Sequence, residues 1–176
     1  MAVDLLRTNR LPPLRSAAAT GLHEGKLQQA VHALKYSGAT EELMVPLGNR
    51  LLTALASLKW PIDVIIPVPL HTARQRERGY NQSQQLGGYM AQVLGVPCDP
   101  LALLRWRDTP PQVGLNREQR QANMRGAFRA NKSLSGRVLL IDDVFTTGAT
   151  LQACALAAHD AGASAIYALT VSAARS

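Results

Sequence analysis

One segment of the chain, residues 138–150 with the sequence VLLIDDVFTTGAT, strongly restricts the folds open to it. The apolar run from Val138 to Ile141 is typical of a strand that is buried on both faces of a parallel sheet. Two adjacent carboxylates, Asp142 and Asp143, follow directly. Small and hydroxyl residues then lead into an apolar helical pattern over 149–162. The segment therefore predicts a strand, a loop and a helix of an α/β fold.

Strand and helix patterns also alternate through the rest of the chain. Apolar residues at helical spacing predict helices over about 27–36, 43–58 and 81–95. Apolar runs predict strands at 62–69, 101–106, 137–142 and 164–172. This alternation is typical of a doubly wound α/β domain, with a mainly parallel sheet flanked by helices. Residues 107–128 contain two adjacent prolines and many basic residues, and we expect them to form a mobile loop.

With 176 residues, of which 47% are hydrophobic, the chain is long enough to bury the core of one domain. Its apolar runs are shorter than the roughly 20 residues that a membrane span needs, and its N-terminus lacks the apolar core of a secretory signal. We therefore expect a cytoplasmic protein without membrane insertion. The two cysteines, Cys98 and Cys154, are too few for a four-ligand zinc site and are expected to be packing residues.

The net charge of +7 is concentrated in one region. Between residues 105 and 137, eight basic residues stand against two acidic ones, whereas the chain from Val138 onward is acidic. A basic segment beside an acidic site suits a polyanion whose metal is held by carboxylates, and it also suits nucleic acid. A positive face that is merely solvated is the alternative interpretation.

The residues after the predicted strand have the chemistry of a phosphate site. In an open parallel sheet, ligands bind beyond the carboxyl ends of the strands, where we expect Asp142 and Asp143 to project into solvent. Thr146 and Thr147 supply hydroxyls, Gly148 permits close approach of the backbone, and the next helix offers free N–H groups to an anion. The carboxylates can accept hydrogen bonds from sugar hydroxyls or hold a bridging Mg2+. The pattern thus predicts a site for a phosphorylated ribose; alternatively, the threonines only cap the helix and one aspartate braces the loop.

Two other phosphate motifs, the P-loop and the dinucleotide-binding glycine motif, are absent from the sequence. Residues 138–150 instead closely resemble the phosphoribosyl pyrophosphate (PRPP) signature of the type I phosphoribosyltransferases. The resemblance implies that Asp142 and Asp143 hold the ribose 2- and 3-hydroxyls and, indirectly, the Mg2+ that is bound to PRPP. It implies that the 5-phosphate is wrapped by Thr146, Thr147, Gly148, Ala149 and Thr150.

The same family has a second loop, for pyrophosphate, after the first strand of its core. Residues 64–82 occupy the corresponding place in this chain. The resemblance assigns to this loop Pro69, Leu70, His71, Arg74 and Arg78. Solvation at the surface is the alternative interpretation for any single arginine, but their clustering at a predicted strand end favours an anion site.

Three segments narrow the resemblance to the ComF family of competence-associated, phosphoribosyltransferase-like proteins: RGYNQSQQLG, TPPQVGLNREQRQANMRGAF and LIDDVFTTGATLQACALAAHDAGA. It implies a phosphoribosyltransferase-like domain over 22–176 after an N-terminal extension over 1–21, with a flexible hood at about 105–130. The hood residues that we single out are Gln112, Arg117, Arg120 and Asn123. Many ComF proteins begin with a cysteine-rich zinc ribbon, but this sequence has no Cys-x-x-Cys, so no zinc is expected.

Two functions from different classes follow from the resemblance. In the first, the chain binds PRPP within the DNA-uptake machinery of natural transformation, and its basic hood contacts single-stranded DNA or a helicase-like competence protein. In the second, the chain is an active Mg2+-dependent phosphoribosyltransferase that acts on an unidentified nucleobase or amine. Such a reaction needs charge placed on the leaving pyrophosphate more than it needs a base. No residue is an evident general base, so the catalytic residues stay unassigned.

Overall fold

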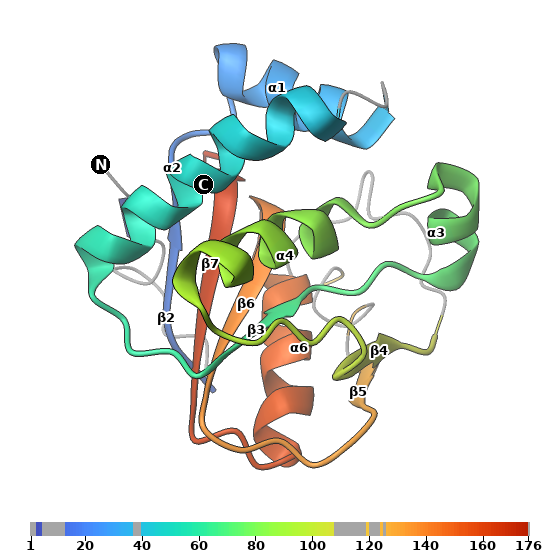
Figure 1. Cartoon of the computed structure of the whole chain (residues 1–176). Coiled ribbons are helices and arrows are strands. Elements are labelled where there is room, and N and C mark those ends of the chain that lie inside the picture. The colour runs from blue at the N-terminus through green and yellow to red at the C-terminus, as the bar shows by residue number, and fades with distance from the viewer. Residues whose placement is uncertain are drawn as a thin grey trace.

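The computed structural model describes residues 3–4, 13–36, 40–107, 119, 124 and 126–175. A five-stranded sheet forms the centre of this part of the chain, with the strand order β1-β2-β7-β6-β3 (Figure 1). Its strands are β1 (Val3–Asp4), β2 (Leu14–Ala19), β3 (Val64–Pro67), β6 (Arg137–Phe145) and β7 (Ala165–Ala173). β1 pairs antiparallel with β2, and the other pairs of this sheet are parallel. The prediction of an α/β fold with a mainly parallel sheet is therefore confirmed.

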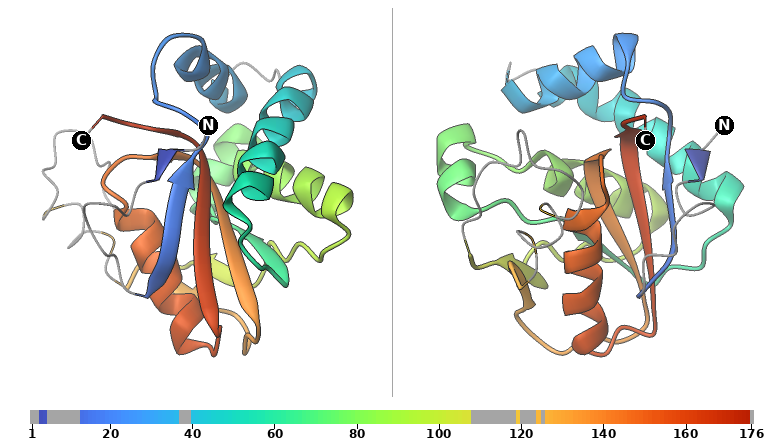
Figure 2. Two further views of the ribbon diagram at one scale, coloured as in Figure 1. Left: turned by 90° about the vertical axis from the view of Figure 1, so that its left-hand side faces the viewer. Right: turned by 180° about the vertical axis from the view of Figure 1, so that it is seen from behind.

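Helices cover both faces of the sheet (Figure 2). On one face the core includes residues of α1 (Gly25–Tyr36), α2 (Thr40–Leu58) and α4 (Gln82–Leu94), and on the other face it includes α6 (Ala149–Asp160). α1 lies beyond the carboxyl ends of β6 and β7, in Figure 1 as in Figure 2. No helix in the described ranges is both long enough and apolar enough to span a bilayer.

The central strands are buried on both faces, as their apolar runs predict. Along β6, Val138 and Leu140 pack on the side of α6, whereas Leu139 and Ile141 pack on the side of α2 and α4. Successive side chains of a strand point to opposite faces, so an unbroken apolar run fits a strand between two helical layers. This layering places the end of β6 between α4 and α6.

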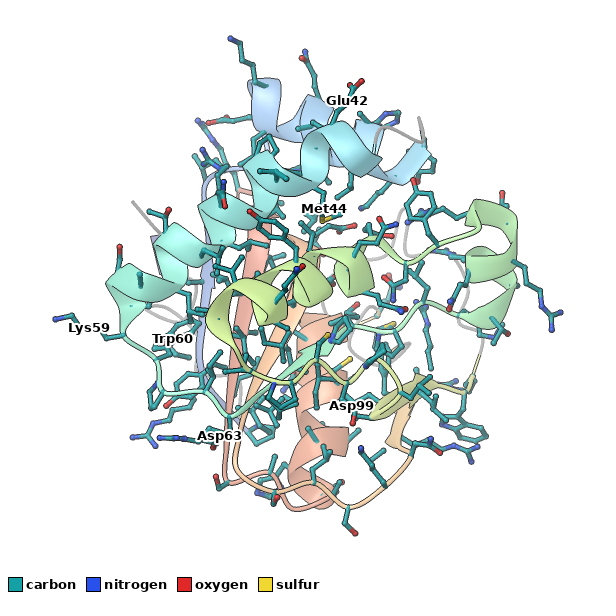
Figure 3. The ribbon with its side chains drawn as sticks, in the orientation of Figure 1. Glu42, Met44, Lys59, Trp60, Asp63 and Asp99 are labelled. Atoms are coloured by element: carbon teal, nitrogen blue, oxygen red, sulfur yellow. The ribbon has the colours of Figure 1, made fainter. Side chains whose placement is uncertain are left out.

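The edge of the sheet opposite α1 is fixed by one ion pair. Asp63, labelled in Figure 3, lies just before β3, and its Oδ1 accepts a hydrogen bond of 2.6 Å from Nη2 of Arg137 at the start of β6. The backbone N–H of Arg137 donates to Oδ2 of the same carboxylate over 2.7 Å. The hydrogen bonds from Arg137 lower the pKa of Asp63 to about 2. They hold β3 and β6 in register at their first residues.

Part of the predicted N-terminal extension, residues 1–21, belongs to the central sheet. β2 lies between β1 and β7, and its residues Leu14 and Ala17 to Ala19 are buried. The central sheet thus includes residues that precede the boundary predicted at residue 22. The sequence pattern did not predict β2, because its core residues are mostly alanines and lack the β-branched and aromatic types that are typical of strands.

The strand predicted at 101–106 forms, but outside the central sheet. It is β4 (Leu103–Arg105), and it pairs antiparallel with β5 (Phe128–Ala130), a strand that the sequence pattern did not predict. Leu103 and Phe128 are buried on the α6 side of the core. Most of the segment between them lies outside the described residues, so a mobile hood at this place stays a prediction.

Candidate functional site

The predicted acid pair lies on the last part of β6, at the edge of the sheet that faces α1 (Figure 1). β6 continues to Phe145, beyond the end of the strand predicted at 137–142, so Asp143 as well as Asp142 is a strand residue. The neighbouring strand β3 ends at Pro67, which is paired with Ile141 just before the acid pair. The ends of β3 and β6 thus meet at one edge, where ligands of parallel sheets bind.

Asp143 does not project into solvent, contrary to the prediction. Its side chain is only 6% exposed, and its Oδ1 lies 3.1 Å from Nζ of Lys35 near the end of α1. The side chain of Gln82, the first residue of α4, donates from Nε2 to Oδ2 of Asp143 over 2.5 Å. A buried carboxylate needs hydrogen-bond donors and an opposite charge, and here α1 and α4 supply both.

Asp142 is partly buried and is also bound by protein donors. Its Oδ1 accepts hydrogen bonds from Oγ of Ser83, at 3.0 Å, and from the backbone N–H of Asp143, at 2.9 Å. Burial and the neighbouring charge of Asp143 raise the pKa of Asp142 to about 7. Asp142 is therefore only partly ionised at neutral pH, since a charge at this partly buried place beside Asp143 is costly.

The predicted phosphate loop is the turn between β6 and α6. Gly148 precedes α6 with a φ of 77°, a left-handed conformation that favours glycine, and no side chain caps the helix at this position. Thr147 Oγ1 accepts a hydrogen bond of 3.4 Å from the backbone N–H of Ala149, which is part of the capping alternative. Thr146 is exposed and Thr150 partly buried. Because first-turn N–H groups have no partner within a helix, this end of α6 can bind an anion.

The residues predicted for pyrophosphate follow β3, but several of them form a short helix. Pro69 is buried and Leu70 is partly buried. His71 caps α3 (Thr72–Arg78), where its Nδ1 accepts a hydrogen bond of 3.4 Å from the backbone N–H of Ala73. The sequence did not predict α3, which has no buried residue and hence no apolar pattern.

The structure connects Arg78 to the acid pair but leaves Arg74 exposed on α3. Nη1 of Arg78 donates to Oε1 of Gln82 over 2.5 Å, and Gln82 in turn donates to Asp143. The guanidinium of Arg78 also lies 5.3 Å from the centre of the Tyr36 ring. Gln82 therefore links the predicted pyrophosphate residues to the predicted ribose residues.

Asn81 fixes the start of α4 beside the acid pair. Its Nδ2 donates to the carbonyl oxygen of Val68 over 3.0 Å, and its Oδ1 accepts from the backbone N–H of Ser83 over 3.0 Å. Sequence reasoning missed Gln82 and Ser83 as contacts of the acids. Both residues lie in the first turn of α4, which comes after β3 in the chain. A helix start after a neighbouring parallel strand indicates this edge of the sheet.

The predicted hood residues lie outside the described residues: Gln112, Arg117, Arg120 and Asn123. Next to that segment, Trp106 is 56% exposed, and the guanidinium of Arg129 lies 5.4 Å from the centre of its ring. Arg105 lies similarly, 5.7 Å from the ring of Phe128. The small sheet of β4 and β5 thus combines an exposed aromatic ring with basic side chains.

No protein-family model matches the sequence. Among solved structures, the chain is similar to glutamine PRPP amidotransferase from Bacillus subtilis complexed with ADP and GMP. The TM-score is 0.46 and the identity 21%, over 69% of this chain and 24% of that one.

The chain is similar in sequence to DNA utilization protein YhgH of Escherichia coli K12, with 32% identity over 88% of this chain and 70% of the relative. The corresponding protein of Salmonella typhi is 33% identical over 80% of this chain, and the match spans 64% of that protein's length. Competence protein F of Haemophilus influenzae is 41% identical over 53% of this chain and 42% of its own length. These relatives confirm the resemblance seen in the sequence, and the chain belongs to the ComF family of competence proteins.

Proposed function

We propose that this chain binds PRPP at the edge formed by β6, α6 and the start of α4, and that it does so in a process of DNA uptake and natural transformation. One observation carries the proposal. A pair of carboxylates lies on the last part of β6, and α6 begins a few residues later, after Gly148, which provides no side-chain cap. A sugar needs acceptors for its hydroxyls and a phosphate needs N–H donors, and this connection offers both within a few residues.

Each part of PRPP has a matching group at this edge. The 5-phosphate would bind the first turn of α6, and the ribose hydroxyls would donate to Asp142 and Asp143. The pyrophosphate would lie toward Arg78, which is already joined to the acid pair through Gln82. A carboxylate has about four lone-pair sites, so a hydroxyl can be added without displacing the protein donors.

Mg2+ would enter this site with the pyrophosphate of PRPP rather than as a resident ion. Within the described ranges, no group of three or more His, Cys, Asp and Glu side chains is placed to hold a metal. Of the four oxygens of the acid pair, three already contact protein donors. The acids therefore do not fit a metal site of their own.

The role in DNA uptake is supported by the names of the relatives, DNA utilization protein and competence protein F. Direct contact with single-stranded DNA is supported by the surface of β4 and β5. There the exposed ring of Trp106 offers a base-stacking platform, and Arg129 beside it can contact phosphate. The matches span 64% and 42% of the lengths of two of these relatives, so their role is assigned to this chain only as a proposal.

Calorimetry with ribose 5-phosphate and PRPP tests the site. Thr147→Val keeps the shape of the side chain but removes the hydroxyl from the loop. We expect a loss of roughly 1.5 to 3 kcal/mol in the binding free energy of both ligands, because a hydrogen bond to a charged group is lost. Thr53→Val on the exposed part of α2 is the matched control and should bind like the parent. Equal affinity of the Thr147 variant and the parent would place the phosphate elsewhere.

A further inference from the structure

The C-terminal end of α1 is tied to the predicted site at three points. Nζ of Lys35 contacts Asp143, the ring of Tyr36 lies under the guanidinium of Arg78, and the carbonyl oxygen of Leu34 accepts a hydrogen bond of 2.6 Å from the hydroxyl of Tyr80. Three consecutive residues of α1 therefore contact either the acid pair itself or the segment between β3 and α4. The position of Lys35 follows from all three contacts, not from its ion pair alone.

These contacts form a closed network. Lys35 contacts Asp143, Asp143 accepts from Gln82, Gln82 accepts from Arg78, and Arg78 lies over Tyr36, which follows Lys35 in α1. Within this network two groups are positively charged. Arg78 contacts the amide of Gln82, whereas Lys35 contacts a carboxylate directly. Its side chain is 24% exposed, so the ammonium is only partly hydrated where it meets a nearly buried acid.

The charge of the acid pair has a cost for an anionic ligand. The negative charge of the acid pair repels a sugar phosphate, and at partly buried sites this repulsion is screened much less than in water. In a metal-bound site, a divalent ion removes that repulsion. Here the ammonium of Lys35, 3.1 Å from Asp143, offsets one negative charge of the pair.

We propose that Lys35 is the built-in counter-cation of the acid pair, so that the ribose 5-phosphate part of a ligand binds at Asp142 and Asp143 without magnesium. The inference rests on the proposed function, because it concerns the same site. In this role Lys35 is a positioning residue, because it acts on the ligand through Asp143. Magnesium then matters for the pyrophosphate part alone.

The test is the magnesium dependence of ribose 5-phosphate binding, measured by calorimetry with the full chain. The parent should bind equally well in excess MgCl2 and in excess chelator, within about twofold. Lys35→Met should bind about tenfold more weakly or worse in chelator, since a charge-assisted contact to the acid is lost, and should recover part of the loss when Mg2+ is added. Lys35→Arg should behave like the parent because it keeps the charge.

Lys26→Met is the matched control, since Lys26 is an exposed lysine in the first turn of the same helix. It should leave both affinities unchanged. A loss of folding alone would weaken binding equally with and without Mg2+, so the dependence on the ion separates the counter-cation role from a structural one. If Lys35→Met does not fold, Lys35→Gln takes its place as the neutral variant, with the same expected dependence on Mg2+.

The inference is overturned if the parent binds ribose 5-phosphate only with Mg2+, or if Lys35→Met binds like Lys26→Met in chelator. Neither result contradicts the proposed PRPP site. Absence of binding of both ribose 5-phosphate and PRPP to the parent, with and without Mg2+, would instead remove the proposed function, and the inference with it. Binding of PRPP with Mg2+ but not of ribose 5-phosphate would overturn the inference alone.

Discussion

Replacing Asp142 and Asp143 one at a time by asparagine should change the free energy of unfolding in opposite directions at pH 8. The two acids are adjacent in sequence, but their surroundings differ. Asp143 has an ammonium partner, Lys35, whereas Asp142 has neutral donors and the charge of Asp143 beside it. The structure therefore separates two residues that the sequence motif treats alike.

For Asp142, the sign follows from its raised pKa. The unfolded chain releases this proton near pH 4, whereas the folded chain keeps it up to about pH 7. Asp142 therefore makes the protein less stable as pH rises from 4 to 7, and the loss is complete above pH 7. A shift from 3.8 to about 7 sets an upper bound of about 4 kcal/mol. Asp142→Asn removes this loss, and we expect a gain of about 1 to 4 kcal/mol at pH 8.

For Asp143, the substitution breaks an ion pair. Fully buried pairs lose about 3 to 5 kcal/mol when one partner is removed, but Lys35 is 24% exposed and can be partly hydrated. The loss is also offset, because the charge of Asp143 no longer acts on Asp142. We expect Asp143→Asn to lower the free energy of unfolding by about 1 to 2 kcal/mol at pH 8.

Urea denaturation of the parent and both variants at pH 5 and pH 8 measures these differences. The advantage of Asp142→Asn should largely disappear at pH 5, where the folded parent keeps the proton on Asp142. The reasoning fails if Asp142→Asn is destabilised at pH 8 as much as Asp143→Asn. It also fails if the difference between Asp142→Asn and the parent is the same at both pH values.

Two further changes test other parts of the molecule. Gly48→Ala should lower the free energy of unfolding by about 1 to 3 kcal/mol in thermal or urea denaturation, because its Cβ would stand 2.3 Å from Cδ1 of Tyr89 where α2 packs on α4. Gly88→Ala on α4 is the control; its Cβ would meet nothing within 4 Å, so stability should rise by up to about 1 kcal/mol. Trp106→Ala should weaken binding of single-stranded DNA in fluorescence anisotropy by about 1 to 3 kcal/mol while PRPP binding persists, and an unchanged DNA affinity would exclude this ring as a stacking platform.

The strand and helix around residues 138–160 were predictable because local chemistry alone specifies them. In an α/β fold, a run that is apolar on both faces fits a parallel strand between two helical layers. The acids, threonines and glycine that follow it lie where the chain leaves the strand and turns into the helix. The prediction placed these residues at the correct edge of the sheet. It was wrong about the exposure of Asp143, because burial there depends on α1 and α4, which come from distant parts of the sequence.

The elements that the sequence did not predict lack a local pattern. β2 packs through alanines, which give no strand signal, and β5 is three residues long and acquires its pairing from β4. Lys35 likewise has no local sequence signal. On α1 it is one more polar residue in an amphipathic helix, and its importance appears only when tertiary packing brings it to Asp143.

A crystal structure of the protein with PRPP tests the proposed site most directly. We expect the 5-phosphate at the first turn of α6, within hydrogen-bond distance of the backbone N–H groups of residues 146–150. The ribose hydroxyls should lie on Asp142 and Asp143, with Lys35 still in contact with the latter. A structure in which PRPP binds at another surface, while the first turn of α6 contacts only solvent, would contradict the proposal.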